Sequence, residues 1–63
     1  GTWSRYNIDG LIVEELNYDN QGRNLYEITY YKNGAVKEYK DYFSKTFQEY
    51  NIDGSKKGDF SPF

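Results

Sequence analysis

Glycine-containing turn signals divide this chain at nearly regular intervals. Gly10, Gly22 and Gly34 are 12 residues apart, and each follows a tyrosine by four positions. A fourth signal, at Gly54, repeats the pentapeptide YNIDG that ends at Gly10. Asp, Asn and Gly are the residues that best tolerate the positive φ angles of tight turns. The segments between these signals are too short for typical helices, so the spacing predicts a series of β-hairpins.

The segments between the turns are rich in Tyr, Ile, Val, Thr and Phe, which favour strands. We predict strands at residues 2–8, 11–18, 23–32, 35–43 and 46–52. The expected fold class is all-β: a five-stranded antiparallel meander of successive β-hairpins with an irregular C-terminal tail. In this prediction residues 1–54 form the sheet, and residues 55–63 form the tail, which packs on the sheet.

Loop lengths determine which residues of neighbouring strands lie opposite one another. We predict two-residue loops at 9–10, 33–34 and 44–45, with Asn33-Gly34 as a type I′ turn, and a four-residue loop at 19–22. This register sorts the side chains into rows that cross the whole sheet. On one face the rows are Tyr6–Val13–Ile28–Tyr39–Tyr50 and Ile8–Leu11–Tyr30–Lys37–Ile52. On the other face they are Trp3–Leu16–Leu25–Tyr42–Phe47 and Arg5–Glu14–Glu27–Lys40–Glu49.

Both predicted faces carry an apolar row, and the eight tyrosines are the main hydrophobic residues of this 63-residue chain. A single flat layer leaves such rows in contact with water. We therefore expect residues 56–63 to fold back so that one or both of Phe60 and Phe63 cover the row that begins at Trp3, with a frayed terminus as the alternative. We also expect self-association as a two-fold homodimer through the row that begins at Tyr6, with a strongly coiled monomeric sheet as the alternative.

Catalytic and metal-binding chemistry has few residues to use. The chain lacks Cys and His, which removes disulfides, thiolate nucleophiles, the commonest general base and the commonest metal ligand. Glu14 and Glu15 point to opposite faces of a strand, so they cannot act together on one bond. Residues 19–22 lack the ligand spacing of a calcium loop, and a hairpin turn explains them. We expect no enzymatic activity, no cofactor and no metal site.

Charge and hydropathy narrow the classes of partner. Eight basic and ten acidic residues give a net charge of −2, which offers no basic surface for nucleic acid. The longest apolar run, Leu11–Val13, is far too short to insert into a membrane. Because the chain begins with Gly and contains no Met, we expect a processed or excised form. Its localisation stays open, with a secreted or cell-surface position preferred.

The tyrosines have two interpretations. An exposed strip of Tyr and Trp can stack on sugar rings, because an aromatic face is flat and apolar and carries a polar edge. In a chain with so few Leu and Val residues, tyrosine also fills a thin sheet while its hydroxyl reaches water. Carbohydrate therefore remains an alternative partner to protein.

The sequence resembles the MORN-repeat-like hairpin modules of bacterial proteins, in the variant found in the YwqK-type antitoxins. The resemblance is carried by the run YYKNGAVK at residues 30–37, with Tyr39 and Tyr42 following. Residues 3–10 and 47–54 look like degenerate copies of it. The run YDNQGR at residues 18–23 is similar to YD-repeat proteins, a weaker likeness. The first resemblance implies successive β-hairpins and a role in protein or membrane-surface contact, with no catalytic residue.

These observations lead to three hypotheses of function. The first is a non-enzymatic β-repeat interaction module that makes protein–protein contacts within a bacterial surface or secreted protein. Its candidate partner-binding residues are Tyr6, Val13, Ile28, Tyr30, Tyr39 and Tyr50. The second is a carbohydrate-binding module that uses an aromatic sheet face and Trp3. The third is a purely structural fragment of a longer repeat array.

Overall fold

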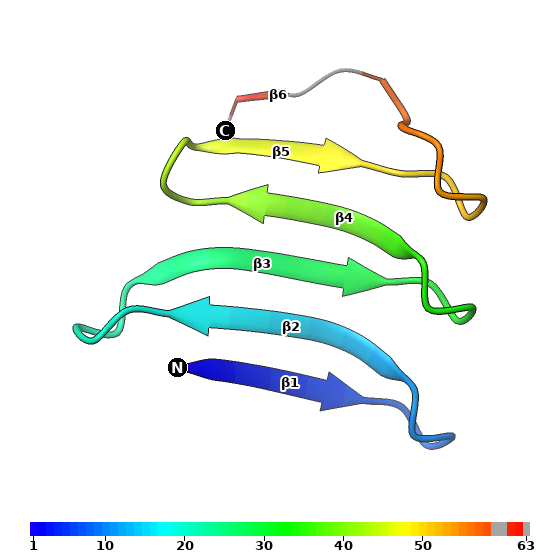
Figure 1. Ribbon diagram of the computed structural model, residues 1–63, viewed down its shortest axis with the longest axis horizontal. Coiled ribbons are helices and arrows are strands. Elements are labelled where there is room, and N and C mark those ends of the chain that lie inside the picture. Colours follow the sequence, from blue (N-terminus) through cyan, green and yellow to red (C-terminus); the bar gives the residue numbers. More distant parts are fainter. Residues whose placement is uncertain (59–60, 63) are drawn as a thin grey trace.

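The computed structural model describes residues 1–58 and 61–62 and contains one open antiparallel sheet (Figure 1). Neighbouring strands in the sheet are also neighbours in sequence, so the predicted all-β, five-stranded meander is confirmed. A sixth strand of two residues lies beyond β5. The strands are β1 (Thr2–Tyr6), β2 (Ile12–Tyr18), β3 (Asn24–Tyr30), β4 (Val36–Asp41), β5 (Thr46–Glu49) and β6 (Ser61–Pro62).

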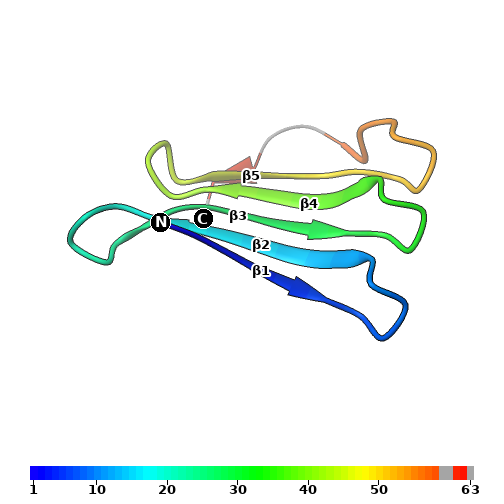
Figure 2. The ribbon, with the colours of Figure 1, turned by 60° about the horizontal axis from the view of Figure 1, so that its bottom comes forward.

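The sheet forms a single layer. Its principal extents are 33 × 30 × 11 Å, and Figure 2 shows a thin, twisted sheet. Among the described residues no hydrophobic side chain is fully buried, and the one buried side chain is that of Gln48, which is 1% exposed. Neither face of the sheet is therefore closed off from solvent by the part of the chain that the structure describes.

The four glycine turns share one hydrogen-bonding pattern, and it differs from the predicted one. In the third turn, Gly34 N donates to Tyr31 O, and Tyr31 N donates to Ala35 O. The same pair of bonds closes the turns at Gly10, Gly22 and Gly54. Only the glycine of each turn has a positive φ, whereas a type I′ turn needs two such residues. The predicted two-residue loops at 9–10 and 33–34, the type I′ turn at Asn33-Gly34 and the four-residue loop at 19–22 are therefore wrong, and each of these loops contains three residues.

Three hairpins also carry an extra residue in the strand that follows the turn. Arg5 pairs with Glu14 but Tyr6 pairs with Ile12, which leaves Val13 without a residue opposite it on β1. Leu25 and Lys37 stand in the same position in the next two hairpins, each three residues after its glycine. The three-residue loops explain the tyrosine spacing, because the tyrosine four positions before each glycine pairs with the residue two positions after it. The pairs are Tyr6–Ile12, Tyr18–Asn24, Tyr30–Val36 and Tyr50–Lys56.

The predicted register holds for β1–β2 and β3–β4 as far as their bulges, beyond which Tyr6–Val13 and Tyr30–Lys37 are wrong, and it is displaced in the other two strand pairs. Trp3–Leu16, Arg5–Glu14, Ile28–Tyr39 and Glu27–Lys40 are paired as predicted. Between β2 and β3, however, Glu14 lies opposite Thr29, which keeps it from facing Glu27 directly. Between β4 and β5, Lys40 lies opposite Phe47 instead of Glu49, because the connecting loop spans residues 42–45. Both displacements are by two residues, so they move no side chain to the other face; only the bulges do so, at Ile12 and Val36.

Strand pairing therefore defines two faces. The charged face carries the rows Trp3–Leu16–Glu27–Lys40–Phe47 and Arg5–Glu14–Thr29–Glu38–Glu49. The tyrosine face carries the rows Ser4–Glu15–Ile28–Tyr39–Gln48 and Thr2–Asn17–Tyr26–Asp41–Thr46, together with the pairs Tyr6–Ile12 and Tyr30–Val36. Paired strand positions of the charged face include six charged side chains, whereas those of the tyrosine face include two, Glu15 and Asp41.

The described part of the C-terminal tail lies along the outer side of β5. Lys56 forms a bridge with Tyr50, and Lys57 N donates to Glu49 O at 2.9 Å. Further on, Ser61 and Pro62 pair with Phe47 and Thr46. Phe60 and Phe63, which the sequence predicts to cover the row beginning at Trp3, lie outside the described residues.

Replacement of Gly34 by alanine is expected to lower the free energy of unfolding by about 1–2 kcal/mol, since an L-residue is strained in the left-handed region. Gly34 has φ +89°, and a Cβ built there meets nothing within 4 Å, so the cost is conformational. Urea denaturation measures it. Asparagine tolerates positive φ, so Gly34→Asn should lower the free energy of unfolding less than Gly34→Ala does. Equal losses in the two variants would contradict this explanation.

Candidate interaction surface

Five of the six predicted partner-binding residues lie together on the tyrosine face. Ile28 and Tyr39 are direct cross-strand partners at its centre, and Tyr30 follows Ile28 on the same side of β3. Tyr6 and Tyr50 lie toward the two sides of the sheet, at the end that carries the turns of Gly10, Gly34 and Gly54 (Figure 1). The sixth residue, Val13, is the extra residue of the first bulge, and Ile12 takes its predicted place opposite Tyr6.

A stacked pair of tyrosines stiffens the centre of this face. The rings of Tyr26 and Tyr39 have centroids 6.0 Å apart and an interplanar angle of 13°. Tyr26 Oη donates to Glu15 Oε2 at 2.9 Å. This hydrogen bond to the Glu15 carboxylate, together with burial, raises the pKa of Tyr26 above its ordinary value. Burial, with the nearby Glu15 charge, also raises the pKa of Tyr30. The hydrogen bond from Tyr26 thus stabilises part of the negative charge of Glu15 on the tyrosine face.

Beside this pair the tyrosine face is hollowed. Val36, Tyr39 and Tyr50 line a shallow depression, whose rim includes Ala35 and Gly54. Tyr31 Oη donates to Tyr50 O at 2.8 Å, which ties the turn before β4 to the end of β5. The lining is mostly apolar and lies on paired strands, so its shape is held by main-chain hydrogen bonds of the sheet.

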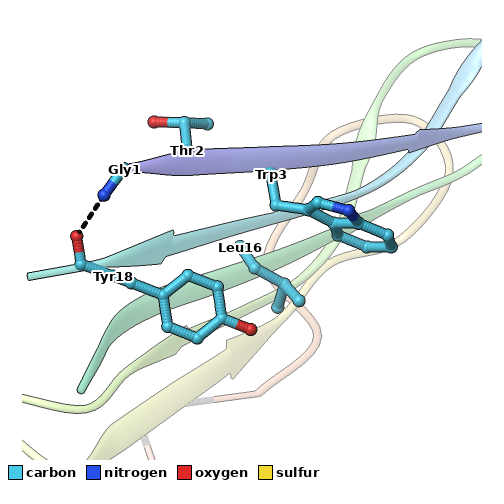
Figure 3. Close-up of a pocket in the computed structure, with 5 residues that line it drawn as sticks. All are labelled: Gly1, Thr2, Trp3, Leu16 and Tyr18. Carbon is cyan, nitrogen blue, oxygen red and sulfur yellow. Dashed lines mark hydrogen bonds between the residues drawn. The ribbon is translucent and has the colours of Figure 1, made fainter. Parts of the chain in front are cut away.

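The charged face has an apolar area of its own at the opposite end of the strands. Trp3, Leu16 and Tyr18 line a shallow hollow of about 430 Å³. Figure 3 shows their side chains on the same side of β1 and β2. The N-terminal amine donates to Tyr18 O at 2.7 Å and closes this end of the β1–β2 pair. Trp3 is 48% exposed. Nearby on the same face, Tyr42 Oη donates to Glu27 Oε2 at 2.8 Å, which raises the pKa of Tyr42.

The turn at residues 19–22 uses its carboxylate within the protein. Asp19 Oδ1 accepts from Gln21 N and Arg23 N, and Asp19 Oδ2 accepts from Arg23 Nε at 2.8 Å. These bonds, that from Arg23 N first, lower the pKa of Asp19. A hairpin turn accounts for all of them, as the sequence predicts. In the described ranges, 1–58 and 61–62, no three His, Cys, Asp or Glu side chains form a group that could hold a metal ion.

Sequence reasoning missed three contributors to the tyrosine face. Ile12 and Val36 reach it through the bulges, and the hydrophobic pattern alone contains no signal for a bulge position. Tyr26 is the third, although its place two residues before Ile28 puts it on the same side of β3. That alternation could have identified it.

Comparisons with protein-family models, curated proteins and solved structures found no match to this chain. No helix within the described residues is long and apolar enough to cross a membrane.

Glu15→Gln is expected to lower the pKa of Tyr26 toward its ordinary value, because the acceptor loses its charge. In the unchanged chain the raised pKa means that the fold favours the neutral phenol. Its contribution to stability is therefore full below pH 10 and is lost as the pH rises through the folded-state pKa. NMR titration of labelled tyrosine rings measures the shift. Glu14→Gln, on the other face, should leave Tyr26 unchanged, and the same shift in both variants would contradict the assignment.

Proposed function

We propose that this chain is a non-enzymatic interaction module that presents its tyrosine face to a protein partner, as part of a bacterial surface or secreted protein. The observation that carries the proposal is an uncovered, mostly uncharged sheet face whose centre is aromatic and aliphatic. Tyr39, Tyr30 and Ile28 contribute to it from adjacent strands. Surfaces of this composition are typical of protein interfaces, which are enriched in tyrosine and depleted of charge at their centres.

The construction of the face supports the same role. Its aromatic residues lie on strands, and the Tyr26–Tyr39 stack restricts ring motion before any partner arrives. A preorganised surface loses less side-chain entropy on binding. The resemblance of residues 30–37 to hairpin modules with contact roles also agrees with this proposal.

Site-specific photocrosslinking in the cells that naturally make this protein tests the proposal. Tyr30→p-benzoylphenylalanine places a photoreactive ring on the tyrosine face, and Tyr18→p-benzoylphenylalanine is the matched control on the charged face. We expect cross-linked protein adducts from position 30 and few from position 18. Equal yields at the two positions, or none at position 30, would contradict a docking role for the tyrosine face.

A carbohydrate-binding module is the second candidate, and the hollow beside Trp3 favours it. The half-exposed indole, with Leu16 and Tyr18, offers an apolar platform of the kind on which sugar rings stack. Glycan-array screening separates the two candidates. Saturable sugar binding that is lost in Trp3→Ala would favour the second, whereas the first predicts no such binding.

A further inference from the structure

We infer that the partner of the tyrosine face is a second copy of this chain, packed face to face in a two-fold homodimer. The inference rests on the proposed function and names the occupant of that surface. The area of the face is the first argument. The sheet measures 33 × 30 Å, so a layer covering most of one face buries on the order of 800 Å² on each copy. That is the size of a standard stable interface.

The distribution of charge selects which face is covered. Packing two copies through the charged face would desolvate the charged residues of its two rows, including Glu38 and Glu49, which lie directly opposite each other. The tyrosine face offers Glu15, Asp41 and Lys56, the partner of Tyr50, and Glu15 already accepts a hydrogen bond from Tyr26. Covering the tyrosine face therefore removes fewer charges from water.

The C-terminal tail selects the direction of the two-fold axis. Gln48 belongs to the tyrosine face, and its Nε2 donates to Gly58 O at 2.9 Å. The tail therefore flanks this face along β5, whereas the side of β1 has no such flank among the described residues. An axis parallel to the strands places the tail of each copy beside β1 of the other. An axis across the strands would bring the two tails together.

The same axis makes the contact self-complementary. Since the strand order is sequential, β3 of one copy then lies over β4 of the other. Ile28 faces Tyr39 of the second copy, and Tyr39 faces its Ile28. Asp41, on β4, lies over β3 of the second copy, and Glu15, on β2, lies over β5. Neither acidic side chain meets its own equivalent. Sheets packed in this way lie about 10 Å apart.

Sedimentation over a hundredfold dilution of the full chain tests the dimer. We expect twice the chain mass of 7.5 kDa at high concentration and the monomer mass on dilution. Ile28→Lys should give a monomer at every concentration, and Thr29→Lys, the neighbouring position on the charged face, should leave the dimer intact. A folded wild-type chain that is monomeric throughout would overturn the inference. So would dissociation caused equally by both variants.

A cross-linking measurement keeps the test decisive if Ile28→Lys does not fold. The chain has no cysteine, so Ile28→Cys and Tyr39→Cys proteins can be mixed and treated with a short bismaleimide. We expect a cross-linked dimer joining positions 28 and 39, and none from Thr29→Cys mixed with Tyr39→Cys. Absence of the first product would overturn the inference. If Tyr30→p-benzoylphenylalanine instead captures a different protein, the proposed function stands and the homodimer fails.

Discussion

Truncation of the chain after Ser55 is expected to remove most of its stability, about 4 kcal/mol, which approaches the whole free energy of unfolding of a domain this small. The truncation keeps the Gly54 turn, because Asn51 N still donates to Ser55 O. It removes the bond from Lys57 N to Glu49 O, the bond from Gln48 Nε2 to Gly58 O, and the pairing of residues 56, 61 and 62 with β5. Each such hydrogen bond contributes about 1 kcal/mol.

The truncation also exposes the edge of β5, and an unpaired edge strand promotes aggregation. Circular dichroism during thermal unfolding measures the loss of stability, and light scattering measures the aggregation. Lys57→Ala is the control, because it removes a side chain while retaining the N–H that pairs with Glu49. It should unfold close to the wild-type midpoint. An unchanged midpoint in the truncated chain would mean that the tail does not stabilise the sheet.

The sequence was sufficient to predict the meander and the composition of the two faces. Glycines at a spacing of 12 located three of the hairpins, and the twofold alternation of strands assigned the side chains outside the bulges to a face. That alternation makes the face assignment robust. The displacements of β3 against β2 and of β5 against β4 are both even, so Glu27 and Lys40 changed cross-strand neighbours without changing face.

The register itself was harder to predict because turn chemistry does not determine loop length. Asn33-Gly34 fits a two-residue type I′ loop, but in the structure only Gly34 has a positive φ and the loop contains three residues. The bulge that follows adds a residue whose identity carries no signal: Val13, Leu25 and Lys37 occupy the same position and share no chemistry. Bulges increase the local twist of a sheet. Their recurrence after three successive glycines spreads that twist over the sheet.

The candidate surface was predictable to the same extent as the faces. Ile28, Tyr30, Tyr39 and Tyr50 required only the parity of their strands, whereas Val13 was misplaced by a bulge. Gln48 was not singled out at all. A glutamine in a strand with many polar residues gives no indication that it will be buried. The burial of Gln48 depends on the tail, which returns along β5.

Gln48→Leu is expected to lower the free energy of unfolding by about 1–2 kcal/mol, because it removes the two hydrogen bonds that the side-chain amide donates. Gln48 is 1% exposed, and its Nε2 donates to Glu49 O and to Gly58 O. Glu49 O keeps a second donor in Lys57 N, so the contact that the variant removes altogether is the one between Gln48 and Gly58 O of the tail. Urea denaturation measures the loss. Gln21→Leu makes the same change in an exposed turn, so it is the matched control and should alter stability little.

Gln48→Glu is expected to lower the free energy of unfolding further at neutral pH, by about 3 kcal/mol. In acid the variant should regain part of this stability. A carboxylate at this position is buried and places one acceptor oxygen, in the position of Nε2, against two carbonyl oxygens, so the fold favours its protonated form and raises its pKa. Protonation restores an O–H donor. The stability of this variant relative to wild type is therefore highest below the ordinary glutamate pKa and falls as the pH rises through the raised value. A constant difference between the two proteins from pH 4 to pH 8 would show that Gln48 Nε2 does not hold the tail to β5.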